Sequence, residues 1–161
     1  MMMEYNELID EFLKGPKKLR EAIAGMSVQQ IDAAPIQGKW STRQVICHVA
    51  DFELVSADRM KRVIAEDNPT LLDGDPDLFA ARLEYPDRKI EEELDLIEVV
   101  RTHLARILRG LKPEVFLRNG NHSAEGPMTL AALIQRTTNH IPHHIQFIKE
   151  KRAEMRPYNQ A

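Results

Sequence analysis

Apolar residues recur at helical spacing along almost the whole chain, and alternating strand patterns are nearly absent. Four long segments carry such a stripe, at about residues 5–26, 42–65, 88–109 and from 130 to beyond 148. Each segment also has a charged face, so each helix has to bury its apolar stripe against neighbours. For 161 residues this pattern predicts one all-α domain over residues 1–161, a four-helix bundle.

Local signals mark the start of the second helix and interrupt the first. Ser41 and Gln44 are spaced as a capping box, and Trp40 and Val45 have the spacing of a hydrophobic staple. The second helix is therefore expected to begin after Ser41. In the first segment, Gly15-Pro16 predicts a kink or a restart, because proline cannot donate the backbone hydrogen bond of a helix interior.

Two connections are long for a bundle, residues 66–87 and 110–128. They leave room for crossover connections that span the bundle rather than join nearest neighbours. The third helix is expected to follow an N-cap at Asp87 and to end at Gly110, in the position where a left-handed glycine often closes a helix. Asn119-Gly120 is a hairpin-turn signal, which predicts a small β-ribbon or a lid in the second connection.

Composition narrows the classes of function. The formal net charge is −3 and the pI is about 6.1, so no basic surface favours nucleic acid or an anionic membrane. No segment approaches the roughly 20 apolar residues of a membrane span, and the acidic N-terminal segment does not resemble a signal peptide. The single cysteine, Cys47, fits a reducing compartment. These features predict a cytoplasmic protein with a small-molecule substrate.

The stretch RTTNHIPHHIQFI, residues 136–148, concentrates histidines on the fourth helix. Residues four apart lie ~40° apart around a helix, so His140 and His144 project from one face and can converge on one point. Pro142 is offset by ~200° from His140, which places its ring on the opposite side of the helix. One alternative remains: the helix could end before Pro142 and restart, which would rotate the two imidazoles apart.

A metal needs a third protein ligand, and His48 is the best candidate. It lies among Val45, Phe52 and Val55 on an apolar stripe, where its ring nitrogens need a partner. Three imidazoles with an open position are typical of a catalytic zinc site. The competing interpretation is a set of hydrogen-bonded core histidines, since an HxxxH spacing is common by chance.

The chain resembles the DinB/YfiT-like superfamily, and within it the YfiT-like, bacillithiol S-transferase-type proteins. The most specific similarities are GKWSTRQVICHVAD, EDNPT, GPMTLAAL and HIPHH, and the likeness extends over nearly the whole chain. The family pattern is a tryptophan-capped helix with one histidine and a late helix with an H-x3-H pair. On this sequence the resemblance implies metal ligands at His48, His140 and His144. Pro142 departs from the family pattern, although the spacing is kept.

The resemblance also implies a function. It implies a divalent metal, zinc or nickel, a homodimer in many members, and transfer of a low-molecular-weight thiol to an electrophile in stress or detoxification. One alternative is a metal-dependent hydrolase that uses a metal-bound hydroxide with the same ligands. Another is a non-catalytic metal-binding bundle.

Other residues are candidates for supporting roles. Asp51 shares a side of its helix with His48 and could orient a ligand or take a proton, although a solvated carboxylate is equally consistent. His143 is expected at the rim of the site. His122, in the long loop, could reach over the site as an acid or base, but it is expected to be a surface residue of that loop. Cys47 is expected to be a buried apolar residue. Arginine side chains could recognise an anionic cosubstrate, and four are candidates: Arg43, Arg59, Arg62 and Arg136.

Overall fold

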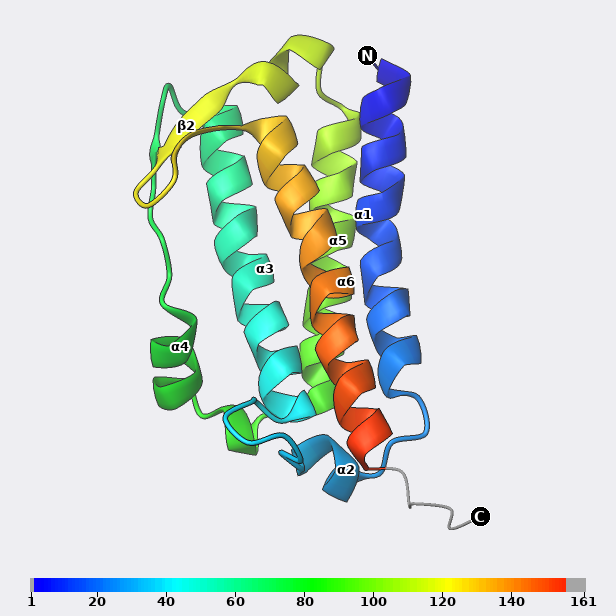
Figure 1. Ribbon diagram of the computed structural model, residues 1–161. Helices are drawn as coiled ribbons and strands as arrows, with labels where there is room; N and C mark the ends of the chain where they lie inside the picture. The colour runs from blue at the N-terminus through cyan, green and yellow to red at the C-terminus, as the bar shows by residue number, and fades with distance from the viewer. Residues whose placement is uncertain (1, 156–161) are drawn as a thin grey trace.

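The computed structural model describes residues 2–155, and four long helices in that part of the chain lie side by side (Figure 1). Helices α1 and α6 run in one direction, and α3 and α5 run in the opposite direction (Figure 1). The predicted all-α four-helix bundle is confirmed. The long helices are α1 (Met2–Ile23), α3 (Thr42–Ala65), α5 (Ile90–Arg109) and α6 (Leu130–Glu154).

The helices are not packed in the order of the chain. Helix α1 packs against α5 and α6, and α3 packs against the same two helices. Helices that follow one another, α1 and α3 or α5 and α6, are therefore diagonal partners. Because α3 and α5 are parallel neighbours, residues 66–89 have to return along the full length of the bundle (Figure 1). The long segments between α3 and α5 and between α5 and α6 are therefore the crossover connections that the sequence predicted.

The connections contain short elements that the sequence analysis only partly anticipated. A three-stranded sheet has the order β1-β2-β3, in which β1 pairs parallel with β2, and β2 pairs antiparallel with β3. The remaining elements are two short helices and two 3-10 turns. The bounds are α2 (Val28–Asp32), β1 (Thr70–Leu71), α4 (Pro76–Arg82), η1 (Tyr85–Asp87), η2 (Pro113–Leu117), β2 (Asn119–His122) and β3 (Gly126–Thr129).

The small β-ribbon was predicted correctly, but its turn was not. Asn119 and Gly120 lie inside β2, and the chain reverses over residues 123–125. The glycine serves packing across the sheet: a Cβ at Gly120 would lie 2.9 Å from Cγ of Leu71 on the neighbouring strand. That strand comes from a connection about 50 residues upstream, so no local pattern could reveal the contact.

The predicted helix starts were partly right. The Ser41 hydroxyl accepts from the backbone N–H of Gln44 at 3.2 Å, and the Gln44 side chain accepts from the Ser41 N–H at 2.9 Å, which confirms the capping box. The N-cap at Asp87 was wrong, because that residue lies in η1, and the N-cap position of α5 is Lys89, which makes no side-chain capping hydrogen bond. Gly110 does end α5, but with φ −85° it is right-handed rather than left-handed.

The restart at Gly15-Pro16 was also wrong, because α1 is continuous through Pro16. Proline leaves the carbonyl of Phe12, four residues earlier, without its helical donor. Arg101 replaces that donor from α5, with Nη1 2.7 Å from the Phe12 oxygen. Gly15 makes room for the guanidinium, since a Cβ there would lie only 2.2 Å from Nη1. The dipeptide is therefore a docking point for Arg101.

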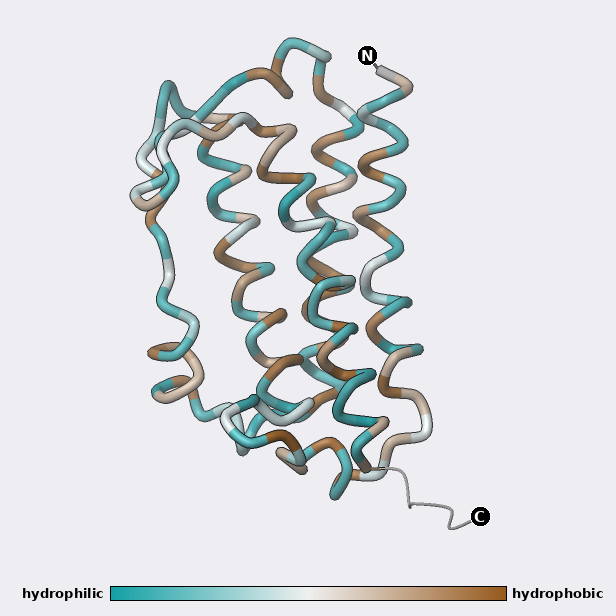
Figure 2. The backbone as a smooth tube through the Cα atoms, in the orientation of Figure 1, coloured by the Kyte–Doolittle hydropathy of each residue, from teal (hydrophilic) through white to brown (hydrophobic). Residues whose placement is uncertain are grey.

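Apolar and polar residues alternate along each long helix (Figure 2). The apolar side chains are buried between the helices and form the core. Arg101 and Glu53 are fully buried within this core, and Nε of Arg101 donates to Oε1 of Glu53 at 3.0 Å. The pair lies between two apolar clusters, one containing Phe12, Met60, Leu104 and Ile134, the other containing Leu19, Ile46, Leu94 and Ile141. No helix within residues 2–155 combines the length and hydropathy that a bilayer crossing requires.

Candidate metal centre

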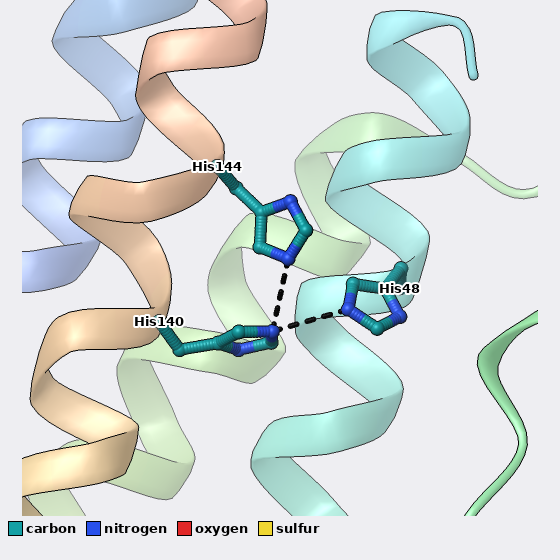
Figure 3. A group of neighbouring side chains, drawn as sticks. All are labelled: His48, His140 and His144. Atoms are coloured by element: carbon teal, nitrogen blue, oxygen red, sulfur yellow. Dashed lines mark hydrogen bonds between the residues drawn. The ribbon is translucent and has the colours of Figure 1, made fainter. Parts of the chain in front are cut away.

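Three imidazoles converge between α3 and α6 (Figure 3). Nε2 of His140 lies 3.1 Å from Nε2 of His48 and 3.0 Å from Nε2 of His144. Helix α6 continues through Pro142, whose side of the helix is exposed, so the alternative in which the helix restarts there was wrong. The four-residue spacing therefore places His140 and His144 on one face, and the fold brings His48 to them from 92 positions away.

Hydrogen bonding alone does not account for this arrangement. A neutral imidazole has one N–H and one lone pair, so Nε2 of His140 can donate to only one of the two nitrogens that face it. Nε2 carries either the N–H or the lone pair of that ring, so only one of the two contacts can be a good hydrogen bond and the second nitrogen lacks a complementary partner. A cation bound by all three lone pairs removes this conflict. Ligand nitrogens 2.0–2.1 Å from a tetrahedral zinc are about 3.3 Å apart, close to the two separations from Nε2 of His140, and all three ligand atoms lie within 4.8 Å of one another.

The protonation state of the three rings suits metal binding. Burial is the largest cause in each case, and it lowers the pKa of His140 to about 2, of His144 to about 3 and of His48 to about 4. Neighbouring imidazoles lower the pKa of His140 and of His144 further. All three rings are therefore neutral near pH 7, and their lone pairs are available to a divalent ion without the loss of a proton.

The surroundings of the cluster are largely aromatic. The His48 ring lies 5.2 Å from Trp40 and 4.6 Å from Phe52, measured between ring centroids. The Phe79 ring of α4 packs against Phe52 in a tilted arrangement, with 5.3 Å between the ring centroids. Nδ1 of His48 and of His144 is buried without a hydrogen-bond partner among the described residues. Packing, rather than a carboxylate or carbonyl acceptor, thus fixes these two rings.

Two recesses are lined in part by the histidines of the cluster. The first, the lysine recess, has a volume of about 260 Å³ and includes His144. Its walls are Trp40 and Phe147, and two lysines lie in it, Lys39 and Lys151. The second, the arginine recess, has a volume of about 300 Å³ and includes both other ligands. Its further residues include Phe52, Arg59, Asp73 and Arg136.

The predicted catalytic residues lie near the cluster but not within it. Asp51 is buried and forms an ion pair at 2.9 Å with Arg88, so its carboxylate already has a strong partner. His143 is exposed, and its ring lies 5.3 Å from that of His144, at the rim of the site as expected. Neither position decides a catalytic role, which stays a prediction for both residues.

The other single residues had mixed outcomes. Cys47 is fully buried, as predicted, and burial raises the pKa of its thiol to about 11. His122 is not the surface residue that was expected. It is 2% exposed in β2, where Nδ1 accepts from the N–H of Ala124 and Nε2 lies 3.7 Å from Asp73 in the arginine recess.

The four candidate arginines divide into two pairs. Arg43 and Arg62 bind acidic neighbours away from the recesses, Asp32 in one case and Asp58 in the other. Arg59 and Arg136 line the arginine recess beside His48 and His140. The sequence analysis did not single out Lys39 or Lys151. Lys151 follows His144 by seven residues, so it lies on nearly the same face of the helix. This spacing could have placed Lys151 near the metal ligands from the sequence alone.

Comparison with known proteins places this arrangement in a family. Residues 11–148 match the model of the DinB superfamily. The chain belongs to the DinB superfamily. A relative in Oceanobacillus iheyensis, named "Putative metal-dependent hydrolase", is 31% identical over 143 residues, covering 89% of this chain and 83% of the relative. A Bacillus mycoides protein with the same description is 30% identical over 155 residues, covering 92% of this chain and 88% of the relative.

Two solved structures are similar to this chain in fold. YfiT from Bacillus subtilis matches with a TM-score of 0.88 and 26% identity, covering 94% of this chain and 87% of YfiT. It is described as a probable metal-dependent hydrolase with an unusual four-helix bundle topology. A second four-helix bundle protein matches with a TM-score of 0.65 at 18% identity, which supports the fold alone. The predicted DinB/YfiT relationship is confirmed.

Proposed function

We propose that this DinB protein is a divalent-metal-dependent transferase that moves a low-molecular-weight thiol to an electrophilic carbon. The observation that carries the proposal is a cluster of three neutral imidazoles flanked by two separate recesses. A transferase has to hold two substrates at one reactive centre, and the two recesses offer a place for each. A divalent ion on the three Nε2 atoms would supply Lewis acidity, which lowers the pKa of a bound thiol or water.

The residues of the chain have distinct tasks in this reaction. His48, His140 and His144 would hold the ion, which would supply the Lewis acidity that activates the nucleophile. Trp40 and Phe52 exclude water from the face of the cluster, which strengthens electrostatic interactions there. The thiol sulfur forms a bond to the carbon as the leaving group departs with its electron pair, and the thiol proton passes to solvent.

A second candidate is hydrolysis by the same residues, with water in place of the thiol. The names of the relatives favour it, since both the Oceanobacillus iheyensis and the Bacillus mycoides proteins are described as metal-dependent hydrolases. The two reactions share the metal ligands and differ in whether one of the recesses holds a thiol. A non-catalytic metal-binding bundle would need the ligands but neither recess.

One experiment separates these functions. Zinc- or nickel-loaded protein is assayed for conjugation of monochlorobimane with several thiols, and for hydrolysis of p-nitrophenyl esters. We expect metal-dependent conjugation that is lost after treatment with EDTA and in His140→Ala. The control is His103→Ala, which removes an exposed histidine of α5. Ester hydrolysis without conjugation would support the second candidate, and inert metal-loaded protein would leave only the binding bundle.

A further inference from the structure

Lys151 is a buried cation with few polar partners among the described residues. Its side chain is 2% exposed, and its one hydrogen bond is to the carbonyl of Phe147, at 3.3 Å. An ammonium group has three donors, and buried charges in proteins are normally paired. No carboxylate among residues 2–155 lies within ion-pair distance of Nζ, in contrast to the buried Arg101, which has Glu53. Burial accordingly lowers the pKa of Lys151.

The ammonium lines the lysine recess next to the metal ligands. Lys151 follows His144 by seven residues, which is two helical turns or about 10.5 Å along α6. Nζ of Lys151 reaches back along α6 to the carbonyl of Phe147. The distance from the charge to His144 is therefore shorter than the distance between the Cα atoms of the two residues. The charge of Lys151 also lowers the pKa of His144. A ligand of a few atoms can therefore contact both the ammonium and the three-histidine cluster.

The rest of the recess supports an anionic ligand with an apolar body. Lys39 adds a second cation, with Nζ 5.7 Å from the centre of the Phe147 ring, and it too lowers the pKa of Lys151. Asp77 and Glu150 also line the recess and are exposed. Glu150 raises the pKa of Lys151 by more than Lys39 lowers it, but burial is the largest cause and the net pKa is lowered. Trp40 and Phe147 provide apolar walls.

The arginine recess offers a weaker case for an anion. Nε of Arg59 already donates to the carbonyl of Leu72 at 3.0 Å, and Arg136 is paired with Glu125. Its carboxylate, Asp73, lies 3.5 Å from Arg59 and would oppose a second anion. The lysine recess therefore differs in having a buried cation whose counter-ion is missing from the described chain.

We infer that the lysine recess binds the thiol cosubstrate through a carboxylate of that thiol, which accepts hydrogen bonds from Lys151 while the sulfur lies at the three histidines. This inference rests on the proposed transferase function and names the chemical class of its thiol. It also explains why a bundle would keep a charge in a place where an apolar side chain would pack without cost.

The test compares ω-mercaptocarboxylates of three to six carbons with the matching ω-mercaptoalcohols, which lack only the charge. With zinc-loaded protein and monochlorobimane, we expect kcat/KM to favour the carboxylate at least tenfold at the best chain length, the size expected of a buried charge-assisted hydrogen bond. Lys151→Met should remove this preference, so that kcat/KM for each carboxylate falls to that of its matching alcohol in the same variant. Lys149→Met, at an exposed position of the same helix, should keep the preference.

A binding measurement makes the inference independent of turnover. Trp40 is the single tryptophan of the chain and lines the lysine recess, so its fluorescence reports occupancy directly. Titration of zinc-loaded protein with 3-mercaptopropionate should show saturable binding that weakens at least tenfold in Lys151→Met, while the melting temperature of that variant does not fall. Binding that is unchanged in Lys151→Met would place the carboxylate on the metal and overturn the inference.

The two readouts separate the inference from the function on which it rests. Carboxylate-dependent binding without any conjugation would refute the transferase function but keep the anion site. Conjugation without a carboxylate preference would keep the transferase and overturn the anion site. A lower melting temperature in Lys151→Met would show that the lysine is structural, and it would also overturn the inference.

Discussion

Replacement of Gly15 by alanine tests the account of the buried arginine, because two effects of opposite sign compete. Alanine is favoured over glycine in a helix interior by about 1 kcal/mol, so propensity alone predicts a more stable protein. The new Cβ would lie 2.2 Å from Nη1 of Arg101 and 2.9 Å from Cδ1 of Ile141. Arg101 would have to move, which breaks its bonds to Phe12 and Glu53.

Breaking a buried charge pair costs about 3–5 kcal/mol, so the net effect of Gly15→Ala is a loss of about 2–4 kcal/mol in the free energy of unfolding. For a chain of 161 residues, this lowers the melting temperature by roughly 4–16 °C. Urea unfolding in EDTA measures the loss without a contribution from bound metal. In an Arg101→Met, Glu53→Met background, the cost of Gly15→Ala should shrink, because its main clash is removed. A Gly15→Ala protein as stable as wild type would refute the reasoning.

Three further outcomes are expected. In metal-free protein, the free energy of unfolding should fall as the pH drops from 7 towards 5. In the folded protein the pKa is lowered to about 4 for His48, about 2 for His140 and about 3 for His144. The same histidines in the unfolded chain take up protons near pH 6.5, so acid favours the unfolded state. The contribution of these rings is complete above pH 6.5, and replacing all three with leucine should flatten the profile of melting temperature against pH. Cys47, buried and with its pKa raised to about 11, should react with Ellman's reagent at pH 8 only after urea unfolds the protein. Asp51→Asn should lower the free energy of unfolding by about 1.5–3 kcal/mol, because the ion pair with Arg88 is lost. The variant should still bind one equivalent of zinc. Loss of the metal would instead show that Asp51 supports a ligand.

Local signals were reliable where the residues that make them also contact each other. The N-cap expected at Asp87 was wrong, whereas the capping box at Ser41 depends on residues three positions apart, and α3 begins where this signal places it. The same holds for His140 and His144, whose shared face follows from helical spacing. His48 could be matched to them because an unpartnered histidine on an apolar stripe needs a partner somewhere in the fold.

Errors arose where a distant contact decides the local conformation. Pro16 was expected to disrupt α1, but Arg101 from α5 supplies the missing donor. Gly120 was expected in a turn, but it lies in a strand to let Leu71 approach. The recesses were missed for the same reason, since each is lined by residues from several segments. A single sequence carries little record of such contacts.

The central claim is that three imidazoles hold one divalent ion at their Nε2 atoms. Zinc-loaded protein, analysed by elemental analysis and X-ray absorption, tests it most directly. We predict one equivalent of zinc with three nitrogen ligands at 2.0–2.1 Å, kept in His103→Ala and lost in His140→Ala. A wild-type protein that retains no divalent ion after dialysis, or one that retains the ion equally well in His140→Ala, would contradict the claim.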